Sequence, residues 1–428
     1  MRGVNVSFLS SYSDSGVKIL TEAMPHMRSI ALGFWINIGT RNEADNLGGI
    51  SHFIEHMLFK GSKKYSSVEI SQTFESLGAD LNAFSSKEYV CFYSRFHDKH
   101  LPIALDVHSD MLQNPLLKEK DIGFEKNVVI EEINLLEDTP DELIHDLFAS
   151  TIFQNHPLGK NVLGDIGSVK SFNQSNVSNF FNENYVTKNI LVAAAGNLEH
   201  EKIVDLINTH FLSAKRDENK KERHEFEPEI HQKLVVRSRK TEQAHICYGT
   251  KAIPAKHPDR FPLAVLDVIL GGGMSSRLFQ EIREKRGLVY TVYSYHSLFS
   301  DTGLFSIYAG TRASKVEEVI KIIQDELIKL LEKGINPGEL DLAREHLKGQ
   351  LVLSLESTHN RMIRIGKSEL VHGEILSLDE IVKRIDEVTL EDVQRVARYL
   401  FKPEKMVLTI IGPTKEKNIT PLMERFKI

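Results

Sequence analysis

The stretch HFIEHMLFKG, residues 52–61, places two histidines and a glutamate within five residues of an otherwise apolar segment. In a helix, His52 and His56 are four positions apart and lie one above the other on the same face. Their imidazoles converge on one point, and the Glu55 carboxylate reaches the edge of that point. This is the geometry of a metal ion with a neighbouring base. The alternative is two ordinary helix-face histidines with local hydrogen bonds, and the intervening glutamate favours the metal site.

A third metal ligand is expected, because a catalytic zinc ion usually takes three protein ligands and leaves a fourth position for water. The segment FEKNVVIEEINLLED, residues 124–138, is predicted to form a helix that is apolar over most of its circumference. Glu125 and Glu132 are seven positions apart and share one face of this helix, whereas Glu131 projects elsewhere. Ligation to a cation would remove the cost of burying a carboxylate there. The spacing alone equally allows ion pairs with lysines at the helix edge.

The composition is that of a globular protein. The chain has 428 residues, of which 41% are hydrophobic and 26% charged, and its net charge is −6. This charge argues against nucleic acid or an anionic membrane as the main partner. The N-terminus has no continuous apolar run, and no stretch approaches the roughly 18 apolar residues of a membrane span, so we expect a cytoplasmic protein. Cys91 and Cys247 are interpreted as small core residues.

Two segments of the chain look like copies of each other. One begins at Val177 (VSNFFNENYVTKNILVAAAGNLEHEKI) and the other at Val393 (VQRVARYLFKPEKMVLTIIGPTKEKNI), an offset of 393 − 177 = 216 residues. Each predicts an amphipathic helix, a strand that ends in Gly196 or Gly412, and a further helix. A second pair, FWINIGTR and HICYGTKA, supports the same division. The chain is therefore predicted to be a tandem repeat of one α+β domain.

The segment between the copies, residues 214–232, is almost wholly polar or charged. We predict a solvated linker at 214–232, between an N-terminal domain at 1–213, which carries the candidate metal ligands, and a homologous C-terminal domain at 233–428. Strands and helices segregate along the first half, which predicts a mainly antiparallel sheet covered by helices in each domain. The expected elements are strands near 17–23 and 29–39, helices near 46–59 and 67–77, the paired strands DLNAFSS and YVCFYSRFH, and helices from about 98 to 153.

The motif HFIEH resembles the inverted zinc motif H-x-x-E-H of the inverzincins. Together with HMLFKGS, EKNVVIEEI and SSRLFQEIREKRGLVYTVYS, it makes the whole chain resemble the pitrilysin and insulinase family. Within that family, the chain is most similar to the bacterial proteases that resemble the mitochondrial processing peptidase. The resemblance implies two homologous domains that form one half of a clamshell chamber, and zinc-dependent hydrolysis of peptide bonds.

The resemblance also implies a role for each candidate residue near the motif. One zinc ion per chain would lie on His52, His56 and Glu132. Glu55 would act as the general base. Glu125 would be a carboxylate that orients one of the two histidines.

Two further sets of residues receive roles only from the resemblance. Arg283 and Tyr290 in REKRGLVY would help to stabilise the oxyanion, although taken alone they indicate a solvated helix arginine and a core-facing strand tyrosine. Asn82, Ala83 and Phe84 in LNAFSS would pair with an extended peptide substrate by strand addition. The alternative for that segment is a plain hairpin strand with Phe84 in the core. The glycine-rich run 271–273 is equally compatible with a simple loop at the entry to a helix.

The predicted function is a zinc endopeptidase that cuts unfolded peptides or presequence-like segments inside a chamber. The alternative is a non-catalytic scaffold or binding subunit, since the family contains members that keep the fold and lose the metal ligands. Every motif position is filled here, which favours an active enzyme with peptides as partners and without nucleic acid or membrane. Single-chain members carry the zinc in the first of four similar domains and the Arg/Tyr pair in the fourth. A two-domain chain therefore implies a homodimer whose catalytic sites are completed in trans.

Overall fold

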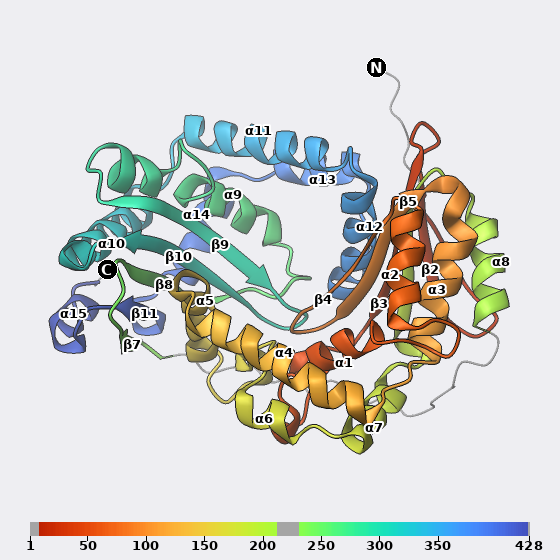
Figure 1. Ribbon diagram of the computed structural model, residues 1–428. Helices are drawn as coiled ribbons and strands as arrows, with labels where there is room; N and C mark the ends of the chain where they lie inside the picture. Colours follow the sequence, from red (N-terminus) through yellow and green to blue (C-terminus); the bar gives the residue numbers. More distant parts are fainter. Residues whose placement is uncertain (1–7, 212–230, 427–428) are drawn as a thin grey trace. The chain divides into compact units, whose positions relative to one another are not determined.

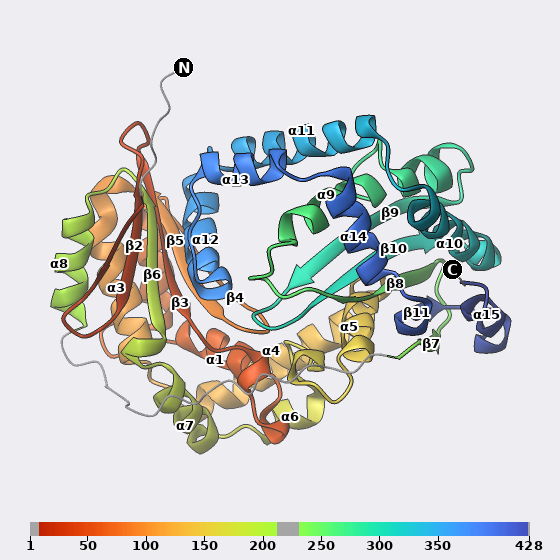
Figure 2. The same ribbon diagram turned by 180° about the vertical axis from the view of Figure 1, so that it is seen from behind.

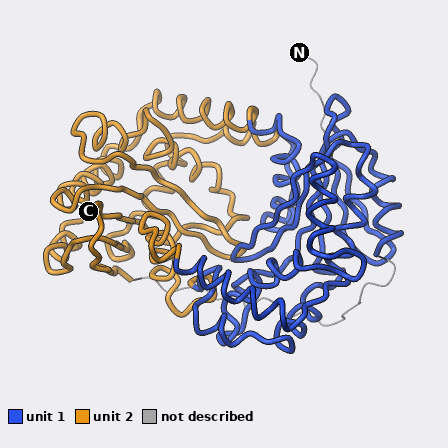
Figure 3. Tube along the Cα trace, in the orientation of Figure 1, with its two compact units in different colours: residues 1–134, 160–224, 354–377 blue, residues 135–159, 225–353, 378–428 orange. Residues whose placement is uncertain are grey.

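The computed structural model describes residues 8–211 and 231–426, which belong to two compact units (Figures 1 and 3). Each unit is built on one β-sheet with helices packed against it. This confirms the predicted α+β class and the division into two similar domains. The segments that make up unit 1 are Met1–Asn134, Lys160–His224 and Ser354–Ser377, and those of unit 2 are Leu135–Gly159, Glu225–Leu353 and Leu378–Ile428.

The sheet of unit 1 has the strand order β1-β2-β6-β3-β5-β4. All neighbouring strands are antiparallel except β2 and β6, which run parallel. Within the described residues β4 pairs with β5 alone, so its outer edge is free of other strands. The strands are β1 (Leu9–Tyr12), β2 (Lys18–Ala23), β3 (Ser29–Ile36), β4 (Asp80–Ser85), β5 (Val90–His97) and β6 (Ile190–Gly196).

Both faces of this sheet are covered, which explains why the central strand β3 is an almost unbroken apolar run. Alternate residues such as Leu32 and Phe34 face a layer of helices, and Ala31 and Trp35 face a single helix, α12 (Thr358–Lys367), on the other side (Figures 1 and 2). The helices of the first layer are α1 (Ile50–Leu58), α2 (Ser67–Ser76), α3 (Leu101–Gln113), α4 (Glu119–Glu137), α6 (Ile166–Ser171), α7 (Gln174–Asn184) and α8 (His200–His210).

Unit 2 repeats this arrangement. Its sheet has the order β7-β11-β8-β10-β9, with β7 and β11 parallel and the other pairs antiparallel. One face packs against a layer of helices, and the other packs against α5 (Pro140–Ile152). The strands are β7 (Lys233–Ser238), β8 (Ala244–Ala252), β9 (Val289–Leu298), β10 (Gly303–Thr311) and β11 (Val407–Gly412). The remaining helices are α9 (Arg260–Leu270), α10 (Val316–Lys333), α11 (Pro337–Ser354), α13 (Leu378–Asp386), α14 (Leu390–Leu400) and α15 (Glu416–Met423).

Most of the elements expected from the sequence are present. β6 and β11 end at Gly196 and Gly412, the 216-residue repeat. At the start of α2, Ser66 accepts from the backbone N–H of Glu69, and the Glu69 carboxylate accepts from that of Ser66, so a capping box is formed. Cys91 and Cys247 are buried free thiols, as predicted.

The compact units differ from the predicted contiguous domains, 1–213 and 233–428, because the two halves exchange a helix. α5 comes from the first half of the sequence and packs in unit 2, and α12 comes from the second half and packs in unit 1. Hydrophobic periodicity shows that a helix has an apolar face but not which sheet that face covers. Of the predicted linker, residues 214–230 lie outside the described part of the chain.

α12 approaches its sheet closely because two glycines lie at the contact, one on the strand and one on the helix. A Cβ on Gly33 of β3 would lie 2.4 Å from the sulfur of Met362, and a Cβ on Gly366 would lie 2.4 Å from Nε1 of Trp35. The helix is also held by Glu22, a fully buried carboxylate on β2.

Two arginines of α12 neutralise that carboxylate. Arg361 and Arg364 both pair with Glu22, the second at 3.0 Å. Losing one partner of such a buried pair would leave an unpaired charge in the interior, which is strongly unfavourable. The exchanged helix is therefore an integral part of unit 1. Among the described residues, no helix is both long and apolar enough to cross a membrane.

Candidate metal centre

The backbone at the start of α1 is fixed by a buried carboxylate. Glu43 is 4% exposed, and its two oxygens accept from the backbone N–H groups of Gly49 and Ser51 at 2.7 and 2.8 Å. These N–H groups belong to the helix N-terminus, where the residue before the helix, Gly49, provides no side-chain cap. Gly49 has φ +86°, and a Cβ there would lie 2.4 Å from the carbonyl oxygen of Leu163. The first turn, which carries His52, is thereby anchored.

The long helix α4 brings the candidate carboxylates to this turn. Glu125 is buried and Glu132 is partly exposed, whereas Glu131 is exposed. The ring atoms Nε2 of His52 and His56 lie 3.7 and 3.6 Å from Oε2 of Glu132. The structure thus brings together the three residues that the sequence analysis predicted as ligands.

The donor atoms of this group fit a single zinc ion. One ligand atom from each of His52, His56 and Glu132 lies within 4.8 Å of the other two. The two Nε2 atoms are 3.2 Å apart, and two nitrogens bound tetrahedrally to zinc at about 2.0–2.1 Å would be about 3.3 Å apart. Two imidazoles and one carboxylate are also the donor set of zinc sites that keep one position open for a water or a substrate.

The local electrostatics favour a neutral His52. Its burial, together with the positive charge of a protonated His56, lowers the pKa of His52 to about 3, although Glu125 opposes this. A neutral imidazole is the form that binds metal. His52 is therefore available to a cation without first losing a proton at neutral pH.

His56 is held from its other side by an ion-pair chain. Its Nδ1 lies 2.8 Å from Oε1 of Glu125, and Oε2 of Glu125 lies 2.5 Å from Nζ of Lys60. Burial would lower the pKa of His56, but the hydrogen bond to Glu125 and the nearby carboxylates outweigh it and raise that pKa. Burial would likewise raise the pKa of Glu125, and the bonds from His56 and Lys60 outweigh it and lower that pKa. The contact leaves Nε2 of His56 facing the other donors.

Glu55, the predicted base, lies beside this group and is not one of its three donors. It is 9% exposed, and burial raises its pKa. Ser85 of β4 donates a hydrogen bond from Oγ to Oε2 of Glu55 at 2.5 Å, which acts in the opposite direction on that pKa.

The predicted substrate-binding residues all lie on β4, the edge strand of the unit 1 sheet. Asn82 is exposed, Ala83 is half-buried, and Phe84 packs against Trp35 with ring centroids 5.8 Å apart. The Phe84 side chain is therefore largely a packing element, and the outer edge of β4 offers backbone groups for pairing.

Arg283 and Tyr290 belong to unit 2. The guanidinium of Arg283 lies 5.2 Å from the centre of the Tyr290 ring, and Tyr290 is 78% exposed at the start of β9. The expectation of a core-facing tyrosine, drawn from the strand pattern alone, does not match the structure. The two side chains instead form a cation–π pair in which Tyr290 is exposed and Arg283 is half-buried.

Three residues that support the cluster, or the helix that carries its histidines, were missed from the sequence. Lys60 follows His56 by four residues, a spacing that places two side chains on the same side of a helix. This spacing indicates that both side chains can reach one carboxylate, which in the structure is that of Glu125. Glu43 and Ser85 carry no such signal, because neither the contact of Glu43 with the start of α1 nor the contact of Ser85 with Glu55 follows from a periodic pattern. Of these three residues, Ser85 is the one that contacts the predicted base, Glu55.

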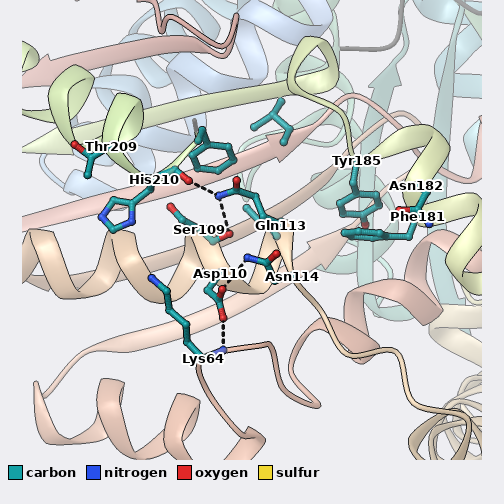
Figure 4. A pocket seen from close by; sticks show the side chains of 13 residues that line it. Lys64, Ser109, Asp110, Gln113, Asn114, Phe181, Asn182, Tyr185, Thr209 and His210 are labelled. Atoms are coloured by element: carbon teal, nitrogen blue, oxygen red, sulfur yellow. Dashed lines mark hydrogen bonds between the residues drawn. The ribbon is translucent and has the colours of Figure 1, made fainter. Parts of the chain in front are cut away.

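A separate pocket of about 390 Å³ lies elsewhere in unit 1, between α3, α7 and α8 (Figure 4). The Asp110 carboxylate in it already accepts from the backbone N–H of Lys64 and from the Asn114 amide. None of the three clustered donors lines this pocket, and among the described residues the one group able to hold a metal ion is His52, His56 and Glu132. We therefore place the candidate site at that cluster.

Comparisons with known proteins show which proteins this chain is similar to. Residues 18–166 match the family model described as insulinase (peptidase family M16), and residues 171–347 match that of the peptidase M16 inactive domain. Uncharacterized zinc proteases of Streptomyces coelicolor and Bacillus subtilis are similar at 42% and 41% identity. The alignments cover 95% and 94% of this chain and 90% and 97% of theirs.

The fold is also found among solved structures. A protease from Helicobacter pylori matches with a TM-score of 0.90 at 24% identity, over 95% of this chain and 100% of that one. A peptidase M16 inactive domain from Pseudomonas fluorescens matches with a TM-score of 0.88 at 23% identity, over 96% and 98% of the two chains. At these identities the likeness shows the fold alone.

Proposed function

Because this chain belongs to the insulinase family of peptidases, peptidase family M16, we propose that it is a zinc-dependent endopeptidase that hydrolyses unfolded peptides or presequence-like segments. The family itself was predicted from the motifs and is confirmed. The observation that carries the proposal is the group of His52, His56 and Glu132, whose donor atoms lie within 4.8 Å of one another. Relatives at 41–42% identity bear the name zinc protease.

The proposal assigns the metal to these three residues. Zinc supplies Lewis acidity, which polarises a carbonyl group and lowers the pKa of a water towards about 7. His52, His56 and Glu132 would hold the ion. Glu125, itself fixed by Lys60, holds the His56 ring by its Nδ1 atom, and such outer partners commonly determine the orientation of a ligand.

Glu55 and β4 would carry the remaining steps. Glu55 takes the proton of the attacking water and returns it to the leaving amine. The substrate peptide pairs through its backbone with the free edge of β4, at Asn82, Ala83 and Phe84. Backbone pairing depends little on side chains, so this mode suits a peptidase that accepts many sequences. It also requires an extended peptide, which is why the proposed substrates are unfolded.

The resemblance supports a homodimer in which Arg283 and Tyr290 of one copy serve the zinc site of the other, within a chamber. The exposure of Tyr290 and its stacking with Arg283 support a surface role for the pair. The homodimer, the chamber and the cytoplasmic location stay predictions.

Mixing two inactive variants would test this arrangement. Glu55→Gln and Arg283→Ala homodimers each lack one element at both sites, so each is expected to be nearly inactive. A mixed dimer has one site with both defects and one intact site. Random subunit exchange should therefore recover up to about a quarter of wild-type activity. Exchange is verified by native mass spectrometry, and verified exchange without recovery would contradict a site completed in trans.

The proposed function is tested by metal removal and return. Purified protein is assayed on a quenched peptide library after treatment with a chelator and again after addition of zinc. We expect one zinc ion per chain by elemental analysis, loss of cleavage with the chelator, and recovery with zinc. Cleavage that is insensitive to chelation would contradict a metallopeptidase.

Stoichiometric zinc without cleavage of any peptide would favour the alternative, a binding subunit of the same fold. The matched model for residues 171–347 is described as an inactive domain. The motif H-x-x-E-H occurs at 52–56 and is not repeated in the second half. A single zinc site per chain is the expected result under either alternative.

A further inference from the structure

Strand β4 carries side chains to both faces of its sheet. Side chains alternate along a strand, so Ala83 and Ser85 lie on one face and Phe84 lies on the other. Ala83 packs with the cluster that includes α1, whereas Phe84 packs with Trp35 on the side covered by α12. Ser85 therefore lies on the face that bears the helix of the H-x-x-E-H motif.

The Ser85 hydroxyl reaches the Glu55 carboxylate from that face. The distance from Oγ to Oε2 is 2.5 Å. Among the described residues, no other side chain donates a hydrogen bond to Glu55. Since Glu55 is only 9% exposed, little water can take the place of this donor. Hydrogen bonds from a hydroxyl to a carboxylate are among the stronger ones in proteins.

We propose that Ser85 is a positioning residue for Glu55: it holds one carboxylate oxygen and so leaves the other turned to the proton that the base must take. A glutamate side chain has three rotatable bonds, and a carboxylate without a fixed partner samples rotamers from which it cannot reach that proton. The inference rests on the proposed function, in which Glu55 is the base.

The same contact ties the base to the substrate strand. Ser85 is the last residue of β4, the strand whose free edge is proposed to pair with the peptide. The hydrogen bond therefore fixes the Glu55 carboxylate relative to the strand that is proposed to hold the peptide.

A pair of isosteric substitutions separates this role from packing. Threonine and valine have the same shape and both favour strands, but only threonine keeps the hydroxyl. Ser85→Val is expected to lower kcat by about 10- to 100-fold, as the loss of an orienting partner does. KM and zinc content should stay unchanged. Ser85→Thr should retain kcat within about threefold, and Ser85→Ala should behave as Ser85→Val does.

Ser76→Ala serves as the matched control. It removes an exposed serine hydroxyl at the end of α2, away from the residues assigned to the site, and should leave kcat unchanged. A wild-type kcat in both Ser85→Val and Ser85→Ala, with Glu55→Gln inactive, would overturn the inference. An equal loss in Ser85→Thr and Ser85→Val would overturn it as well, because packing would then be the cause.

A readout without catalysis makes the two proposals separable. In metal-free protein, the urea midpoint is measured for Ser85→Ala, Glu55→Ala and the double variant, with fluorescence of Trp35, the one tryptophan of the chain, as the signal from unit 1. We expect the midpoint shift caused by Ser85→Ala to disappear in the Glu55→Ala background. If Ser85→Ala shifts the urea midpoint as much in the Glu55→Ala background as in the wild type, the inference that Ser85 holds Glu55 is overturned. If wild-type protein with zinc cuts no peptide, the proposed function fails, and the urea cycle still decides whether Ser85 holds Glu55.

Discussion

Glu55→Gln is expected to lower kcat by about 10²- to 10⁴-fold, the range over which a positioned general base contributes. The amide has nearly the shape of the carboxylate and can still accept a hydrogen bond from the Ser85 hydroxyl, but it cannot take a proton from water. Because Glu55 is not among the three clustered donors, zinc content should remain at one ion per chain. The measurements are steady-state cleavage of a quenched peptide and elemental analysis of the same sample.

The control for this substitution is Glu75→Gln, which makes the same chemical change at an exposed position on α2. Its kcat should equal that of the wild type. Near-normal cleavage by Glu55→Gln would remove Glu55 from the mechanism. Loss of zinc from Glu55→Gln would instead place this carboxylate among the ligands, in disagreement with the geometry of the cluster.

Glu132→Ala should abolish both zinc binding and cleavage. It removes one of three donors, and its Oε2 atom lies within 3.7 Å of both Nε2 atoms. The zinc affinity is therefore expected to fall by more than the roughly 10- to 100-fold that losing an outer partner costs. Isothermal titration of metal-free protein with zinc measures this directly, and it does not depend on the identity of the substrate.

Glu131→Ala is the matched control on the same helix. It removes the same charge from the neighbouring residue, which is exposed, so any general effect of charge is common to both variants. We expect wild-type zinc affinity and wild-type cleavage from Glu131→Ala. If Glu131→Ala loses zinc and Glu132→Ala keeps it, the third ligand has been assigned one residue out of register.

The parts of this site that could be predicted from sequence are those that local spacing encodes. A four-residue interval places His52 and His56 on one face of α1, and a seven-residue interval places Glu125 and Glu132 on one face of α4. The apolar run of β3 and the repeated strand that ends at Gly196 and Gly412 likewise follow from patterns in the sequence, a short hydrophobic segment and a 216-residue offset. Each of these signals can be read from one short segment, or from the comparison of two segments that repeat each other.

The parts that could not be predicted depend on which segment meets which. The contact of Ser85 with Glu55 joins a strand edge to a helix, and the cap that Glu43 provides joins a loop to a helix six residues later. Neither follows from a periodic pattern. The exposure of Tyr290 could not be predicted from the sequence either, because a tyrosine in a strand is as compatible with a core as with a surface.

Because of the exchanged helices, the boundary between the two sequence repeats differs from the boundaries between the two compact units. Shifted by 216 residues, Pro140–Ile152 of α5 would fall at 356–368, which is where α12 lies. Each copy of the repeat thus supplies the other's sheet with the same element, which is the pattern of a domain-swapped dimer whose two chains have been fused.

The exchange also limits how the chain can be cut. A fragment that ended between the two copies would present the Trp35 face of its first sheet to water and would leave Glu22 without its ion-pair partners Arg361 and Arg364. Neither half of the chain is therefore expected to fold stably by itself.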